Sequence, residues 1–115
     1  MSLCDDKRFD VYTSPLCLAI AFYFAEKKSG KTLAGKKINL IADKIRMTTM
    51  NEEVVKKTIS NKSISDFEDG LEYYSALQSR CRCIITSNGK DFYFSELEVL
   101  NAQDFLLKYV VVKKK

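Results

Sequence analysis

Apolar and polar positions near the start of the chain change from the period of a strand to that of a helix. Residues 9–13 alternate and are rich in β-forming side chains, which predicts a first strand. Ser14 and Pro15 then predict a helix start, with the serine as cap and the proline in the first turn. This helix is expected to run to Lys28. Its apolar run, residues 16–25, is too short to span a membrane and predicts a buried helix.

The pattern continues with a second helix and a second strand. The helix is expected over residues 33–44, with Ile38, Ile41 and Ile45 on one apolar stripe. A short strand is predicted over residues 46–50.

A third helix is expected after Asn51, which has the chemistry of a helix cap. Two acidic residues in its first turn interact favourably with the positive end of the helix dipole. Its predicted inner face consists of Val54, Val55, Thr58 and Ile59.

A fourth helix is expected from Ser65 to Ser79, because Ser65 and Glu68 have the spacing of a capping box. Strands are predicted over residues 81–87 and 98–100, and a last helix is predicted after Asn101. The alternation of strands and helices predicts one α/β domain with a mostly parallel sheet. The residues expected to be buried in the fourth helix are Phe67, Leu71, Tyr74 and Leu77.

Composition fits one globular domain of modest size, since 46% of the 115 residues are hydrophobic and glycine and proline are scarce. The four cysteines, Cys4, Cys17, Cys81 and Cys83, form no C-x-x-C pair, and the absence of histidine excludes imidazole catalysis. We therefore expect reduced core thiols, a cytoplasmic protein and no membrane segment.

Basic residues are in mild excess, with a formal net charge of +4. One interpretation of the basic cluster in the first half of the chain is a solvated surface, and the other is contact with RNA phosphates. The cluster consists of Lys27, Lys28, Lys31, Lys36 and Lys37.

Acidic residues mark the start of the fourth predicted helix. Asp66 and Asp69 are three positions apart and share one helix face. A helix that leads into a parallel strand starts above the far end of that strand, so these carboxylates are expected to approach Asn88 and Asp91. Carboxylates without histidine or cysteine suit Mg²⁺ or Mn²⁺.

Two structural explanations of the same residues remain open. Acids in a first helical turn stabilise the helix by roughly 0.3–1 kcal/mol each, without any ligand. Asn88-Gly89 is also a hairpin signal between the apolar residues 84–86 and 92–94.

Three segments resemble the C-terminal half of a PIN domain. They are DFEDGLEYYSAL at residues 66–77, IITSNGKDF at residues 84–92 and LEVLNAQDFL at residues 97–106. The resemblance extends over residues 9–107. It implies a three-layer α/β/α fold with a mostly parallel sheet, and a Mg²⁺- or Mn²⁺-dependent endoribonuclease of the kind found as the toxin in toxin–antitoxin pairs. RNA and an antitoxin protein are the implied partners.

The resemblance also implies roles for individual residues. Asp69 takes the position of the third family acid, and Asp91 can carry the charge of the fourth. Asp69 and Asp91 are therefore the expected catalytic residues, and both are expected to bind the metal together with Asp66. Thr86 and Asn88 are expected auxiliary residues.

The chain departs from the PIN pattern in its first half. No segment matches the strand that carries the first family acid, which lies centrally in the sheet, and the second acid falls near the apolar Ile20. We therefore expect residues 4–112 to form a PIN-like domain that lacks its first strand, after an artificial start at residues 1–3 and before a basic tail at residues 113–115. Such a domain is expected to be incomplete or inactive, and to close the gap in its sheet by rearranging or by pairing with a second copy.

Two other functions remain as alternatives. One is a non-catalytic PIN-like module that binds a protein, which the apolar Ile20 favours. The other is an unrelated α/β interaction module whose acids only cap helices.

Overall fold

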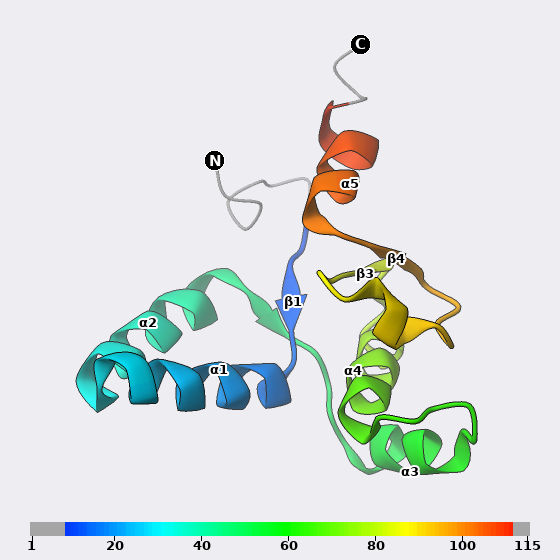
Figure 1. Cartoon of the computed structure of the whole chain (residues 1–115), viewed down its shortest axis with the longest axis horizontal. Helices are drawn as coiled ribbons and strands as arrows, with labels where there is room; N and C mark the ends of the chain where they lie inside the picture. The colour runs from blue at the N-terminus through cyan, green and yellow to red at the C-terminus, as the bar shows by residue number, and fades with distance from the viewer. Residues whose placement is uncertain (1–8, 112–115) are drawn as a thin grey trace. The chain divides into compact units, whose positions relative to one another are not determined.

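The computed structural model describes residues 9–111, and Figure 1 shows the helices and strands in chain order. The chain divides into two compact units, Met1–Met50 and Asn51–Lys115, and each is described by itself. The expected artificial start and basic tail lie outside the described residues. A single domain over residues 4–112 stays a prediction.

The first unit contains two short strands and two helices. The strands pair in parallel, with Tyr12 opposite Arg46 and Thr13 opposite Met47. A backbone hydrogen bond of 2.8 Å from the Thr48 amide to the Thr13 carbonyl continues the pairing. The elements are β1 (Tyr12–Thr13), α1 (Pro15–Ser29), α2 (Lys31–Lys44) and β2 (Arg46–Met47).

Both ends of α1 follow from local chemistry. The Ser14 hydroxyl accepts a 2.9 Å hydrogen bond from the Cys17 amide, and Pro15 occupies the first turn, as predicted. Gly30 lies at φ +85°, a region that side chains disfavour, and its amide donates to the Glu26 carbonyl. The Gly30 carbonyl in turn accepts from the Ala34 amide, so one glycine ends α1 and begins α2.

The prediction that α1 is a buried helix is wrong for this structure. None of its side chains is buried, and Tyr23 and Phe24 are 51% and 63% exposed. In α2 the buried side chain is Ala34, whereas Ile41 is exposed. The physical reason is that the first unit offers α1 one neighbouring helix and a two-residue strand pair, which cannot cover an apolar surface on all sides. Within residues 9–111, no helix is both long and apolar enough to cross a membrane.

The second unit begins with two helices and continues into a second parallel strand pair. Cys83 lies opposite Glu98, and Ile85 opposite Leu100. A short 3₁₀ helix, η2, connects the strands, and a π-helical turn, η3, follows the last α-helix. The elements are α3 (Glu52–Ser60), α4 (Phe67–Gln78), β3 (Cys83–Ile85), η2 (Gly89–Phe92), β4 (Glu98–Leu100), α5 (Ala102–Leu106) and η3 (Leu107–Val111).

The core of the second unit lies between α3 and α4. Val54 and Thr58 of α3 are buried, as the sequence predicted, but Ile59 is exposed. The fourth member of the predicted inner face, Val55, is half-buried. Gly70 of α4 allows the two helices a close approach.

In α4 the buried face is rotated from the predicted one. Leu71 is buried as expected, but Tyr73 and Ala76 are buried as well, while Phe67 is 51% exposed. The Tyr73 hydroxyl accepts a 3.1 Å hydrogen bond from the Glu96 amide, which gives this residue a polar partner inside the unit.

One local prediction, the cap of α4, and one alternative that the sequence left open, the hairpin at Asn88-Gly89, are wrong. Ser65 is not the cap of α4. Asp66 takes that position, because its carboxylate accepts from the amide three positions on and leaves Ser65 one residue outside the helix. Asn88-Gly89 does not form a hairpin, because the chain enters η2 there and β3 pairs in parallel with β4.

The α/β class with parallel strand pairing is confirmed. The described residues form two separate strand pairs, one in each unit. A three-layer arrangement around one sheet, with its first strand missing, stays a prediction.

Candidate functional site

The first part of the candidate site is the start of α4. Asp66 caps the helix, and its Oδ1 accepts a 3.1 Å hydrogen bond from the Asp69 amide. Asp66 is exposed and Asp69 is half-buried. One carboxylate is therefore fixed by the backbone, and the other lies at the edge of the packed helix pair.

The second part is the turn that follows β3. The Thr86 amide donates to the Leu100 carbonyl at 2.9 Å, which extends the parallel pairing by one residue. The Thr86 hydroxyl accepts from the Asn88 amide at 3.1 Å, and the Asn88 carbonyl accepts from the Asp91 amide at 3.0 Å. Thr86 and Asn88 thus shape the turn that carries the exposed Asp91.

Two tyrosines connect this turn to the α4 segment. The Tyr93 hydroxyl donates to the Ser63 carbonyl and lies 3.4 Å from the Ser65 hydroxyl. Tyr73 accepts from the Glu96 amide, and its ring packs edge-on against Phe94 with 5.2 Å between ring centroids. The residues around Asp66 and Asp91 therefore belong to one packed assembly.

The carboxylates of the two segments affect one another electrostatically. Partial burial raises the pKa of Asp69 above its ordinary value, and the negative charges of Asp66 and Asp91 raise it further, ahead of the smaller effects of Glu68 and Glu72. Asp91 thus acts on Asp69 although 22 positions separate them in the sequence. A cation near these carboxylates would offset their mutual repulsion.

The residues fit a divalent cation in kind, because carboxylate oxygens are its usual ligands. Within residues 9–111, however, no group of three or more histidine, cysteine, aspartate or glutamate side chains lies close enough to hold a metal ion. Within the described residues, Cys17, Cys81 and Cys83 form no disulfide bond, and burial raises the pKa of the last two. The fourth cysteine lies outside the described residues.

Replacing Asp91 with asparagine is expected to lower the pKa of Asp69 towards its ordinary value of 3.8, because one repelling charge is removed. The pKa of Asp69 is higher in the folded protein than in the unfolded chain, so protonation of Asp69 favours the folded state. This contribution to stability is fully present below about pH 3.8 and is lost as the pH rises through the raised pKa. NMR titration of the Asp69 carboxyl carbon measures the shift. Asp43→Asn, in the other unit, is the control. An unchanged pKa in Asp91→Asn would show that the two carboxylates do not interact.

The predicted basic cluster lies in the first unit, at the end of α1 and along α2. All five side chains are exposed. The Lys27 ammonium lies over the Tyr23 ring at 4.6 Å, and Lys31 is 3.8 Å from Glu26. These contacts are those of a solvated surface, and contact with RNA stays a prediction.

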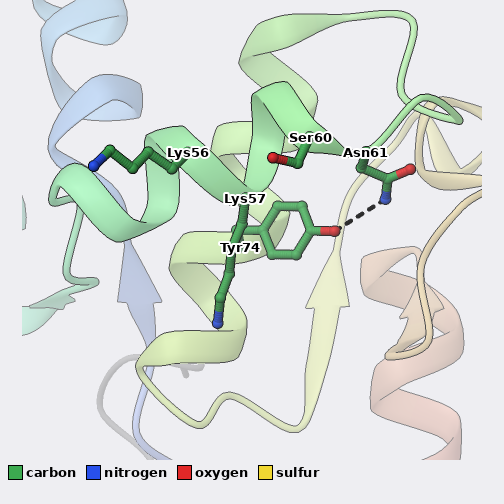
Figure 2. Close-up of a pocket in the computed structure, with 5 residues that line it drawn as sticks. All are labelled: Lys56, Lys57, Ser60, Asn61 and Tyr74. Atoms are coloured by element: carbon green, nitrogen blue, oxygen red, sulfur yellow. Dashed lines mark hydrogen bonds between the residues drawn. The ribbon is translucent and has the colours of Figure 1, made fainter.

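Sequence reasoning missed three contributors to the second unit. The roles of Tyr93 and Tyr73 could not be predicted, because the residues with which their hydroxyls form hydrogen bonds are far from them in the sequence. A hollow between α3 and α4 was also missed. Figure 2 shows the residues that line it: Lys56, Lys57, Ser60, Asn61 and Tyr74.

Comparison with known proteins identifies a family of PIN-type α/β proteins. The chain is 30% identical over 102 residues to Ribonuclease VapC1 of Aquifex aeolicus (strain VF5), an alignment that covers 85% of this chain and 69% of that protein. No family model matches the chain. No solved structure matches it either. The extent and identity of the alignment show that the chain belongs to the VapC/PIN-type family.

Proposed function

We propose that this chain carries the Asp69–Asp91 part of a Mg²⁺- or Mn²⁺-dependent endoribonuclease site. The observation that carries the proposal is the similarity to Ribonuclease VapC1. The alignment covers 85% of the 115 residues. Whichever residue it begins at, it must therefore include residues 20–95, which contain both acidic segments. The mutual repulsion of the acids around Asp69 supports the assignment.

Each site residue has a distinct role in this proposal. Asp69 and Asp91 are the catalytic carboxylates, and Asp66 contributes a third one while capping α4. Thr86 and Asn88 hold the turn that presents Asp91. A divalent cation at these carboxylates would supply the positive charge that offsets an RNA phosphodiester and activates water.

The proposed site is incomplete in the residues that the structure describes. The position of the second family acid falls near Ile20, whose side chain cannot bind a cation or a proton. For that reason we propose that the chain by itself cleaves RNA weakly or not at all. Its proposed partners are RNA, an antitoxin protein and a second copy, and the proposed compartment is the cytoplasm.

A non-catalytic PIN-like protein-binding module is the second candidate, and Ile20 is the observation that favours it. Both candidates predict little RNA cleavage by the chain, so Mn²⁺ binding distinguishes them. The ribonuclease proposal requires Mn²⁺ binding at Asp69 and Asp91. A protein-binding module that lacks the metal site requires no Mn²⁺ binding.

The proposal is tested by incubating single-stranded RNA with the chain and Mn²⁺, beside a Mn²⁺ titration of the folded protein and of Asp69→Asn. The expected result is Mn²⁺ binding that depends on Asp69, with cleavage close to the buffer rate. Strong cleavage that disappears in Asp69→Asn would contradict the proposed incompleteness. Absence of Mn²⁺ binding would contradict the proposed site.

A further inference from the structure

The hollow between α3 and α4 lies wholly within the second unit. It measures about 520 Å³, which is within the range of roughly 300–1,000 Å³ that is usual for small-molecule sites. Four of its residues lie in the second half of α3 or follow it directly, and the ring of Tyr74 contributes from α4 (Figure 2). None of the proposed metal residues lines it.

The lining combines two cations with neutral hydrogen-bonding groups. Lys56 and Lys57 supply the ammonium groups, and Ser60 and Asn61 supply a hydroxyl and an amide. Among the residues that the structure describes, no carboxylate lines the hollow. The lining residues therefore offer positive charge and hydrogen-bond donors, which is the chemistry that recognises a phosphate group.

The lysines already pair with glutamates one turn earlier on α3. Lys56 lies 2.6 Å from Glu52, and Lys57 lies 3.0 Å from Glu53. All four side chains are more than half exposed, so water screens both pairs. A phosphate can therefore replace the glutamates as the partner of the lysines at a small cost in free energy.

The aromatic side of the hollow is held in a fixed orientation. The Tyr74 hydroxyl accepts a 3.0 Å hydrogen bond from the Asn61 amide group, the bond drawn in Figure 2. Asn61 is itself held, because its Oδ1 accepts from the Ser63 amide at 2.9 Å. Tyr74 thus presents a preoriented ring in the hollow that the two lysines also line, and a base can stack on such a ring without sequence preference.

A whole nucleotide fits these groups better than a free phosphate does. The hollow lies beside the last turn of α3, where the helix dipole is negative and opposes an anion. The contact between a base and the Tyr74 ring supplies affinity that this end of a helix does not give to phosphate alone.

We propose that the hollow binds one nucleotide of a single-stranded RNA, with its phosphate at Lys56 and Lys57 and its base against Tyr74. This inference rests on the proposed function for the choice of RNA. Tyr74 is five positions beyond Asp69 on α4, which places it about 7.5 Å further along the axis and about 140° around it. The hollow is thus a separate contact that holds the strand away from the acidic residues.

The test measures binding of a fluorescent eight-nucleotide RNA to the full chain in EDTA, where no metal site can contribute. The double variant Lys56→Gln/Lys57→Gln is expected to reduce the slope of log affinity against log salt by about 0.7, because the contact with one phosphate is lost. Tyr74→Leu is expected to weaken binding at least about fivefold. Lys62→Gln/Arg82→Gln removes the same charge from exposed positions of the same unit and is expected to leave the slope unchanged.

An equal loss in the two double variants would overturn the proposal, since it would show binding to charge alone. Amide NMR signals of Ser60 and Asn61 provide a second measurement that needs no variant. They are expected to shift with the RNA and to shift with AMP only at much higher concentration. Tighter binding of AMP than of RNA, or no shift with RNA, would also overturn it. Asp69→Asn is expected to leave this RNA binding in EDTA intact, so the hollow and the metal site can fail separately.

Discussion

Replacing Tyr73 with alanine is expected to destabilise the second unit by about 3–5 kcal/mol, the usual loss for a buried aromatic side chain. Tyr73 is 3% exposed, and its ring packs edge-on against Tyr74 and Phe94, with centroid distances of 5.0 and 5.2 Å. Its hydroxyl also satisfies the Glu96 amide. The variant removes the packing of α4 against the segment after η2 and leaves that amide without its partner.

Urea denaturation, followed through the amide signals of α4, measures the loss in the second unit by itself. Tyr73→Phe keeps the ring and separates the hydroxyl contribution, which is expected to be about 1 kcal/mol. Ile59→Ala, a truncation at an exposed position of α3, is the matched control and is expected to cost about 0.5 kcal/mol or less. Equal losses in Tyr73→Ala and Ile59→Ala would contradict the described packing.

Replacing Gly70 with alanine is expected to cost about 2 kcal/mol, although alanine favours a helix more than glycine does. A Cβ atom at this position would lie 2.5 Å from the Thr58 methyl carbon, and 3.0 and 3.1 Å from two carbons of Ile64. Thr58 cannot turn away easily, because it is buried, β-branched and bonded to the Val54 carbonyl at 2.8 Å. The helices must therefore separate, and α4 carries Asp69.

Gly35→Ala is the control for this change, because a Cβ atom there meets nothing within 4 Å and the residue lies inside α2. It is expected to stabilise the first unit by about 0.5–1 kcal/mol. The two substitutions are chemically identical and have opposite expected signs. A stabilising Gly70→Ala would show that α3 and α4 pack less closely than described.

Sequence reasoning succeeded where short-range chemistry decides the structure. Ser14, Asn51 and Asn101 cap their helices as predicted, because each side chain accepts from an amide three positions on. The same reasoning failed by one residue at the fourth helix. Ser65 and Asp66 both have side chains that cap helices well. The sequence does not reveal that the Tyr93 hydroxyl contacts Ser65, and the cap is Asp66.

Burial was harder to predict because it depends on what covers each face. The apolar run of α1 suggested a buried helix, yet its side chains are partly or fully exposed in the first unit. In α4 the buried face includes Tyr73, whose hydroxyl accepts a hydrogen bond from the Glu96 amide. No periodicity rule includes a partner 23 positions away.

The candidate site was partly predictable for a topological reason. A helix followed by a parallel strand brings the helix start towards the strand end, and Asp91 does raise the pKa of Asp69. The strand itself is shorter than predicted, and the connection is a 3₁₀ helix. The hollow at Tyr74 could not be predicted, because Lys56 and Lys57 have the pattern of a solvated face.

The most direct test of the central claim is a Mn²⁺ titration of the folded chain, followed by paramagnetic broadening of amide NMR signals. We expect the signals of residues 66–69 and 88–91 to broaden together at the lowest Mn²⁺ concentrations. Asp69→Asn should weaken this binding at least about tenfold, a change of about 1.4 kcal/mol, whereas Asp43→Asn should leave it unchanged. Broadening confined to one of the two segments, or the same affinity in Asp69→Asn, would contradict a shared metal site at Asp69 and Asp91.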